Sequence, residues 1–223
     1  MFRYDTHVHS SEVSACATND VKKMIHKYID LGYSGFILTN HFFNGNSCIP
    51  QRLSWERKVE LFLDPYIKAK AICTEMDFEV FFGWEYNHYG TEFLTYGLDE
   101  HFLLSNPDIL RLSLEEYARL VHDNGGILVH AHPFREAYYI DEIRLFPEFT
   151  DAVEAVNGAQ TDYDYNEKAT EYAKKHRLPM TAGSDAHYVS HSRFCGMEFE
   201  KRIDSIEGFI TAIKNSEGSL FVI

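Results

Sequence analysis

The first residues able to do chemistry stand near the N-terminus, where the segment YDTHVHS (residues 4–10) carries two histidines two positions apart. On a β-strand, residues at this spacing point to the same face, so His7 and His9 project side by side. Two neutral imidazoles held in this way make half of a site for a first-row metal ion. Such a pair also occurs by chance, so the prediction depends on whether other segments supply matching ligands.

Four further segments place ionisable side chains where short strand-like runs end. They are TNH (39–41), GWE (83–85), VHAHP (129–133) and GSDAH (183–187). The third repeats the spaced histidine pair, and the fourth carries a carboxylate and an imidazole at the same spacing. Burying such groups costs free energy unless they are paired or bound to a metal. The repetition therefore predicts a metal site built from the ends of several strands.

The segments between these motifs alternate between strand-like and helix-like patterns. Helical periodicity covers about residues 18–30, 53–76, 114–124, 166–176 and 206–215. Strands that alternate with crossover helices indicate an α/β fold with a mostly parallel sheet. A closed or distorted β/α barrel is the preferred version, because barrel enzymes place their sites at the C-terminal ends of the strands. The length of 223 residues and the lack of a Pro/Gly/Ser-rich linker predict a single domain over residues 1–223.

The composition argues against some classes of function. A net charge of −13 disfavours a large nucleic-acid surface, which needs tracks of Lys and Arg. No apolar run approaches the roughly 20 residues that span a bilayer, and no signal-peptide pattern precedes the first strand. The cysteines, at positions 16, 48, 73 and 195, lack CxxC spacing, as expected of free thiols in a reducing cytosol. We therefore expect a cytoplasmic protein without nucleic-acid or membrane partners, its oligomeric state left open by the sequence.

Taken in order, the motifs HVHS, TNH, GWE, AHPFR, VEAVN and GSDAH resemble those of the PHP family, named for polymerase and histidinol phosphatase domains. The resemblance covers about residues 4–200 and is of the histidinol-phosphatase-like kind. It implies a distorted (β/α)7 barrel, similar to a TIM barrel, with two or three divalent metal ions at the C-terminal ends of the strands. Mixed histidine and carboxylate ligands suit Zn²⁺, Mn²⁺ or Fe²⁺.

The resemblance also implies which residues hold the ions. It assigns a first ion to four ligands, a second ion to a histidine that shares a bridging glutamate with the first, and a third ion to two histidines. The first ion would be held by His7, His9, Glu85 and Asp185. The second would be held by His132 and would share Glu85 with the first. The third would be held by His41 and His187. Glu154 and Asn157, within VEAVN, are expected to orient ligands rather than to bind an ion.

Two positions depart from the family pattern. Relatives commonly have TDH where this chain has TNH, so a carboxylate beside His41 is lost. The series that follows HVHS is shifted, and Glu12 is the candidate to complete the third ion site. Glu92 stands where many relatives have a histidine for the second ion, with His88 as a nearby alternative.

Phosphoester hydrolysis is the natural use of such a centre, because clustered divalent ions activate water and clamp the attacking and leaving oxygens of a displacement. We predict a metal-dependent phosphoesterase that acts on a small phosphate monoester, of the sugar phosphate, nucleotide or histidinol phosphate type, through metal-activated hydroxide. Arg135 and Arg193 are the candidates to hold phosphate oxygens, since a guanidinium matches phosphate geometry. His130 or His191 is the candidate to protonate the leaving alkoxide.

Two other classes of function are left open. An amidohydrolase-like C–N or C–O hydrolase uses a similar two-metal barrel, typically bridged by a carboxylated lysine. No lysine stands at a strand end here, which favours the phosphoesterase. The other alternative is a non-catalytic, metal-binding PHP scaffold, and the presence of the histidines and carboxylates described above argues against it.

Overall fold

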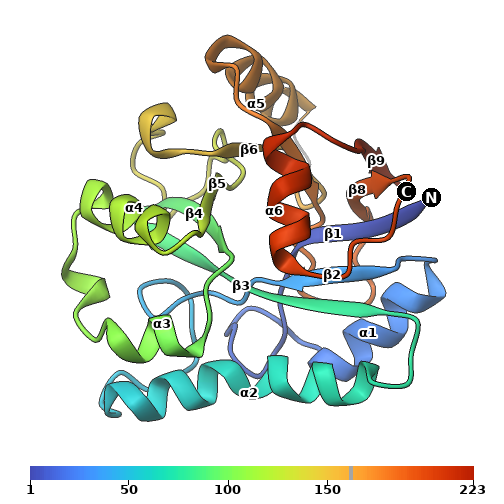
Figure 1. Ribbon diagram of the computed structural model, residues 1–223. Helices are drawn as coiled ribbons and strands as arrows, with labels where there is room; N and C mark the ends of the chain where they lie inside the picture. Colours follow the sequence, from blue (N-terminus) through green and yellow to red (C-terminus); the bar gives the residue numbers. More distant parts are fainter. Residues whose placement is uncertain (161–162) are drawn as a thin grey trace.

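One mixed β-sheet forms the centre of the molecule. The computed structural model describes residues 1–160 and 163–223. Within these residues, nine strands pair in the order β7-β6-β5-β4-β3-β2-β1-β8-β9 (Figure 1). The strands are β1 (Phe2–Val8), β2 (Gly35–Leu38), β3 (Glu79–His88), β4 (Thr91–Tyr96), β5 (Ile127–His130), β6 (Ala152–Asn157), β7 (Met180–Gly183), β8 (Cys195–Phe199) and β9 (Ser219–Val222).

The sheet curves until β7 meets β1. The amide of Asp185, just after β7, donates to the carbonyl of His7 at 2.9 Å, and the amide of His9 donates to the carbonyl of Ala186 at 3.0 Å. A parallel bridge between Val8 and Ala186 accompanies these bonds. The sheet is therefore nearly closed, which confirms the predicted barrel-like α/β fold. Closure also places motifs from the two ends of the sequence next to each other.

The barrel is less regular than a repeat of β/α units. Strands β1, β2 and β3 run parallel to one another, as do β5, β6 and β7, but β4 is antiparallel to both of its neighbours. The cause is local, because β3 turns directly into β4 at residues 89–90. Gly90 has a φ of 89°, which a glycine adopts without strain, and its amide donates to Asn87 Oδ1 at 3.2 Å. A hairpin thus replaces one crossover and distorts the barrel.

Helices surround the sheet. They are α1 (Val21–Asp30), α2 (Trp55–Cys73), α3 (Glu100–Ser105), α4 (Leu114–Asp123), α5 (Tyr163–His176) and α6 (Ile206–Lys214), with short 3₁₀ turns η1 (Ile109–Arg111) and η2 (Pro147–Phe149). Local chemistry sets where they begin. Asp20 caps α1 by accepting from the Lys23 amide at 2.8 Å, and Ser113 and Glu116 form a reciprocal capping box at α4. In the described part of the chain, no helix has the length and apolar character that crossing a bilayer requires.

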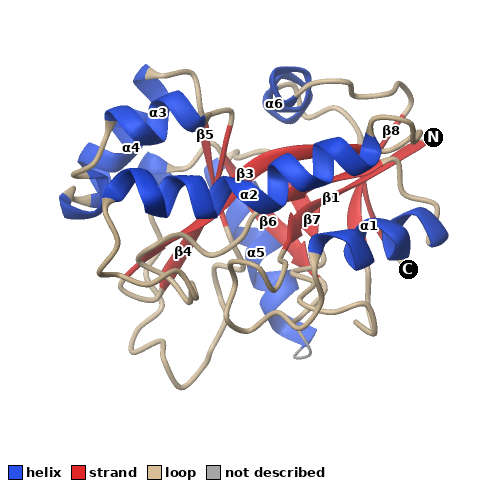
Figure 2. Ribbon diagram, turned by 90° about the horizontal axis from the view of Figure 1, so that it is seen from below, coloured by secondary structure: helices blue, strands red, loops and turns tan. Residues whose placement is uncertain are grey.

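Helix α6 closes one end of the barrel. Its buried residues Phe209 and Ile213 pack with residues near the N-terminal ends of strands, among them Tyr4, Phe81 and Ile127. Figure 2 shows α6 at one side of the molecule and the long loops at the other. Those loops follow the C-terminal ends of the strands, where the polar motifs lie. Helix α6 and the polar motifs therefore lie at opposite ends of the barrel.

A buried carboxylate ties three of these elements together. Asp5 of β1 is fully buried and accepts hydrogen bonds from the Tyr28 hydroxyl of α1 at 2.7 Å and from the His7 amide at 3.0 Å. It also accepts from the hydroxyl of Ser184 and, at 2.9 Å, from the Ser184 amide just after β7. Burial raises the pKa of Asp5 to about 7, although these donors act in the opposite direction. Asp5 thus joins β1, α1 and the end of β7.

We predict that Asp5→Ala lowers the free energy of unfolding by about 3 kcal/mol, because it leaves several buried donors without an acceptor. Denaturant unfolding of the metal-free protein measures this change. Asp30→Ala, which removes an exposed carboxylate at the end of α1, is expected to change stability by less than about 0.5 kcal/mol. Equal stability of the two variants would contradict the structural role of Asp5.

Candidate metal centre

Eight ionisable side chains meet at the polar end of the barrel, in the described part of the chain. In overlapping groups of three, their ligand atoms lie within 4.8 Å of one another. The side chains come from β1, β3 and β4, or directly follow β1, β2, β5 and β7. They are His7, His9, His41, Glu85, Glu92, His132, Asp185 and His187. Residues far apart in the sequence thus converge on one place.

Both histidines of the HVHS motif present Nε2 to this place. His7 Nδ1 donates to Glu154 Oε1 at 2.9 Å. His9 Nδ1 donates to Ser14 Oγ at 3.0 Å, and that hydroxyl in turn donates to Asn40 Oδ1 at 2.9 Å. A partner on Nδ1 fixes each ring and leaves Nε2 with a free lone pair. Asn40, which stands where the family commonly has aspartate, thus still accepts the hydrogen bond that orients His9.

Glu85 of β3 lies in the middle of the group. Its Oε1 is 3.0 Å from His132 Nε2 and 3.3 Å from His7 Nε2. Its Oε2 is 2.7 Å from His41 Nδ1 and 3.5 Å from His9 Nε2. A carboxylate whose two oxygens face different pairs of imidazoles suits a bridge between two cations. This is the geometry that the family resemblance implies for Glu85.

An unusual backbone directs two of the side chains. His132 and Asp185 have φ values of 26° and 54°, in the left-handed region that non-glycine residues rarely adopt. Such conformations cost on the order of 1–3 kcal/mol and persist where the surrounding structure enforces them. Gly183 allows a close approach at the same point, since a Cβ there would lie 2.5 Å from His7 Cβ and 2.7 Å from Glu154 Oε1. The GSD segment therefore brings β7 against β1 and turns Asp185 into the centre.

Glu154 of β6 accepts hydrogen bonds from residues of the centre without belonging to the grouped ligands. Besides accepting from His7, it accepts from the His132 amide at 2.9 Å and from Asn157 Nδ2 at 2.8 Å through Oε2. Arg135 lies on the same side, pairs with Asp185 and approaches Asn157 Oδ1 at 3.4 Å. Glu154 and Asn157 thus contact the residues that hold the centre and stand outside the grouped ligands.

Burial and neighbouring charges shift the pKa values of His7 and His9 in opposite directions. Burial, together with the nearby His187 and His41, holds the pKa of His9 well below its usual value. Burial also lowers the pKa of His7, but the surrounding carboxylates, Glu154 first among them, raise it well above the usual value. His9 is therefore held as the neutral imidazole that a metal ion requires, and His7 stands in a strongly negative environment.

The carboxylates of the centre show a similar conflict. Burial alone would raise the pKa of Glu85, but the adjacent His41 and His7 imidazoles hold it well below its usual value. Burial and the charge of Glu85 raise the pKa of Glu92. Carboxylates that are buried this close together are stable as anions when cations lie between them.

The residues present fit divalent cations. Nε2 of His7 and Nε2 of His9 are buried and have no hydrogen-bond partner among the described residues. Unpartnered buried polar atoms are costly, and these atoms belong to the groups that converge at the strand ends. Imidazole nitrogens and carboxylate oxygens together form a ligand set typical of Zn²⁺, Mn²⁺ and Fe²⁺.

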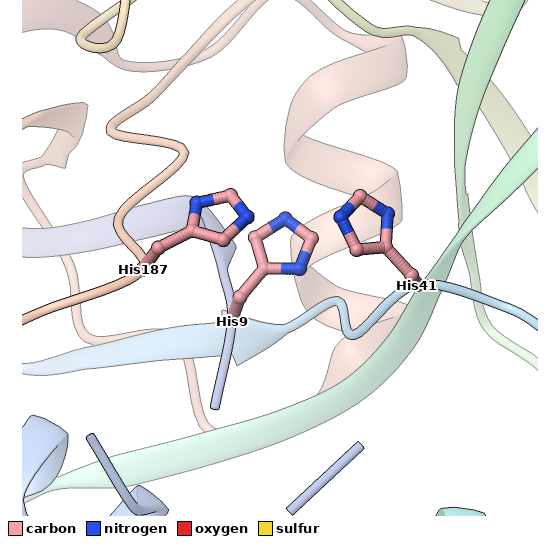
Figure 3. A group of neighbouring side chains, drawn as sticks. All are labelled: His9, His41 and His187. Atoms are coloured by element: carbon pink, nitrogen blue, oxygen red, sulfur yellow. The ribbon is translucent and has the colours of Figure 1, made fainter. Parts of the chain in front are cut away.

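His9, His41 and His187 form the side of the centre that reaches solvent. Figure 3 shows their rings in a row with His9 between the other two. The centroid of His9 lies 4.1 Å from that of His187 and 4.5 Å from that of His41. The side chains of His41 and His187 are 10% and 17% exposed, whereas that of His9 is fully buried. His187 Nδ1 donates to the Asp185 carbonyl at 2.9 Å, so Nε2 is the ring nitrogen that remains for a ligand.

The structure brings seven of the eight predicted ligands together and adds Glu92. Glu92 of β4 is buried, and its Oε2 lies 3.6 Å from His132 Nε2. Glu12 does not join the group. Its carboxylate instead accepts from the Val21 amide at 3.1 and 3.2 Å, at the start of α1. His88, the alternative to Glu92, is half-buried at the end of β3 and packs against aromatic rings.

The four predicted catalytic residues lie in different surroundings. Arg135 adjoins the centre through its ion pair with Asp185. His130 is fully buried against aromatic rings, and burial lowers its pKa to about 3. His191 and Arg193 are half-buried in the loop after β7. Of these two, Arg193 makes no ion pair with the residues that the structure describes, and His191 Nε2 has no hydrogen-bond partner among them.

Cys16, which the sequence prediction treats as an ordinary free thiol, lies beside the centre. It stands in the loop between β1 and α1, with Sγ 3.2 Å from His41 Nε2. Burial raises a thiol pKa, but hydrogen bonds with His187 and His41 outweigh it and lower the pKa of Cys16 to about 6. The signal in the sequence is its place within the shifted series that follows HVHS. Spacing alone does not distinguish it from Glu12.

Known proteins share parts of this sequence. A family model described as PHP-associated matches residues 164–217, which run from α5 to α6. Among curated proteins, an uncharacterized protein of Methanocaldococcus jannaschii is 29% identical over 116 residues, covering 46% of this chain and 49% of that protein. The chain thus matches about half the length of this curated relative.

Solved structures share the fold. A two-domain protein from Bacteroides vulgatus, described as containing a predicted PHP-like metal-dependent phosphoesterase, matches with a TM-score of 0.72 and 16% identity over 99% of this chain. The match spans 64% of that protein, less than two thirds. An amidohydrolase from Chromobacterium violaceum, solved with bound sulfate and no metal, matches with a TM-score of 0.59 and 16% identity over 83% of this chain and 87% of its own. The protein therefore has the fold of the PHP-like metal-dependent phosphoesterases, as its strand-end motifs imply.

Proposed function

We propose that the protein is a metal-dependent phosphoesterase that hydrolyses a small phosphate monoester. The observation that carries this proposal is the position of Glu85, a buried carboxylate with imidazoles on both sides at the polar end of the barrel. Divalent ions held there would activate water and neutralise the charge that develops on a phosphate during displacement. The likeness in fold to the Bacteroides vulgatus protein supports the same class of reaction.

The solvent-facing side of the centre indicates where the substrate would enter. The side chains of His41, His187 and Arg135 are 10%, 17% and 17% exposed. Those of His7 and His9 are fully buried. A phosphate that enters from this side meets a guanidinium, whose planar fork of N–H donors matches two phosphate oxygens. We assign Arg135 to holding the phosphate. A sugar phosphate, a nucleotide or an ester of the histidinol phosphate type would each fit this assignment.

A proton must also reach the leaving alkoxide. His191 lies in the half-buried loop after β7 and has an Nε2 without a hydrogen-bond partner among the described residues. Burial lowers its pKa, so the imidazolium that would donate the proton is populated mainly toward acidic pH. His130 lies fully buried against aromatic rings and offers no surface to a substrate. We therefore propose His191 rather than His130 as the proton donor.

A second candidate function is hydrolysis of a C–N or C–O bond, which the likeness in fold to the Chromobacterium violaceum amidohydrolase favours. The bridging position weighs against it. Glu85 occupies that position, and no lysine is buried among the residues that the structure describes. A carboxylated lysine therefore has no place in this centre, and the phosphoesterase is the better-supported proposal.

The test of the function is phosphate release from a panel of phosphate monoesters and diesters, with Mn²⁺-loaded protein and with the same protein after chelation. We expect turnover of a group of monoesters that chelation abolishes and reloading restores. Metal analysis of each sample gives the number of ions per chain. If protein that holds its ions turned over amides or lactones and no phosphate ester, the second candidate would replace the first.

A further inference from the structure

We propose that Cys16 supplies a sulfur ligand to the solvent-facing side of the metal centre, where it joins His41 and His187 and makes this ion position selective for Zn²⁺ over Mn²⁺. The inference rests on the proposed metal centre but not on its reaction. It replaces Glu12, the ligand expected from the sequence, with a ligand of different chemistry.

The loop that carries Cys16 is fastened between the two histidines. On one side, the Ala15 amide donates to the Asn46 carbonyl at 2.9 Å, in the loop that begins at His41. On the other side, the Thr18 amide donates to the His187 carbonyl at 2.9 Å. Cys16 lies between these attachments, with Sγ 3.2 Å from His41 Nε2. The backbone therefore places the thiol where the two imidazoles meet.

A second observation identifies the same position as a ligand site. His9 is fully buried, its Nε2 has no hydrogen-bond partner among the described residues, and it groups with His41 and His187 within 4.8 Å. Figure 3 shows its ring between the other two. Three converging imidazoles already offer nitrogen ligands, so Cys16 adds sulfur to an existing group.

The two sides of the centre then differ in chemical character. Glu85, Glu92 and Asp185 supply the oxygen atoms of the centre, each in a group with histidines, and such ligands suit Mn²⁺ as well as Zn²⁺. A thiolate with imidazoles on the solvent-facing side suits Zn²⁺ or Co²⁺, because sulfur is a poor ligand for harder ions such as Mn²⁺. When the ion binds, the sulfur–metal bond replaces the S–H bond and the thiol proton passes to water. Mn²⁺ and Zn²⁺ are therefore expected to occupy the centre to different extents.

Cobalt substitution tests this proposal without an activity assay. Co²⁺ is titrated into metal-free wild-type protein, Cys16→Ser and Cys48→Ser, and the near-ultraviolet sulfur-to-cobalt absorption is recorded. Cys48 is the matched control, because it is also exposed and its thiol donates to the Glu12 carbonyl at 3.3 Å, away from the three histidines. We expect the absorption in the wild type and in Cys48→Ser, and its loss in Cys16→Ser.

Competition and alkylation give independent readouts. Cys16→Ser is expected to lower the affinity for Zn²⁺ by at least about tenfold, which is the lower end of the loss seen when an outer partner of a metal ligand is removed. The affinity for Mn²⁺ is expected to change less. Zn²⁺ is expected to protect Cys16, and not Cys48, from iodoacetamide, because a bound thiolate is no longer a free nucleophile.

The outcomes separate this inference from the proposed function. Wild-type protein that binds Co²⁺ without sulfur absorption, or that alkylates Cys16 equally fast with and without Zn²⁺, overturns the sulfur ligand and leaves the phosphoesterase proposal standing. Sulfur absorption that is confined to proteins with Cys16 supports the ligand even if no phosphate ester is turned over.

Discussion

Glu85→Gln is expected to lower kcat/KM for a phosphate monoester by at least about 100-fold and to reduce the metal content of the purified protein, since loss of a direct ligand costs at least as much as loss of an outer partner. The amide keeps the size of the side chain but removes the negative charge that faces four imidazoles, His132 and His7 on one oxygen and His41 and His9 on the other. Metal analysis and steady-state kinetics on the same preparation measure both effects.

Glu79→Gln is the matched control for this substitution. Glu79 stands at the start of the same strand, partly exposed, and pairs with Lys70 at 3.3 Å. Because exposed ion pairs contribute little, this variant is expected to keep its metals and its activity. A Glu85→Gln protein with unchanged metal content and unchanged kcat/KM would rule out the bridging assignment.

Arg135→Ala is expected to lower kcat/KM by roughly 100-fold, the typical loss when one donor to a developing oxyanion is removed. The guanidinium lies beside the centre, where it pairs with Asp185. The variant is expected to retain its metal ions. Asp185 then lacks its cationic partner, and a buried carboxylate without a partner is stabilised by a bound metal ion. Arg135→Lys, which keeps the charge but not the fork, is expected to fall between wild type and alanine.

Arg144→Ala controls for general loss of positive charge near the site. Arg144 is a partly exposed guanidinium of the same connection after β5, where it pairs with Glu142 at 3.4 Å. Its replacement is expected to leave kcat/KM unchanged. If Arg135→Ala lost its metal ions together with its activity, Arg135 would act by positioning Asp185 and not by holding phosphate.

The strand-end residues of the candidate centre were predictable because their signal is local. His7 and His9 share a face through the two-residue period of a strand, and TNH, GWE and GSDAH each follow an apolar run. Parallel strands bring their C-terminal ends to the same edge, so residues that end such runs are expected to meet. Here β7 closes against β1, and the Asp185 amide donates a hydrogen bond to the carbonyl of His7. This contact brings the first and last of these motifs together.

The loops were harder to predict because irregular backbone has no period. The sequence after HVHS made Glu12 the candidate for the third ion site and left Cys16 as an ordinary thiol. The tertiary structure sends the Glu12 carboxylate to the Val21 amide at the start of α1 and holds Cys16 against His41. Which of the two reaches the centre depends on long-range attachments of the loop, such as the bond from Thr18 to His187.

The sequence by itself therefore determined the α/β barrel class, the strand ends that carry the ionisable groups and the identity of most of them, because these depend on short-range periodicity. Only the tertiary structure decided that β3 and β4 form a hairpin that brings Glu92 to His132, that Glu154 holds both His7 and the His132 backbone, and that Cys16 lies beside the histidines. These contacts join residues far apart in the chain. They depend on how the barrel closes and on how the loops pack over it, which no local pattern records.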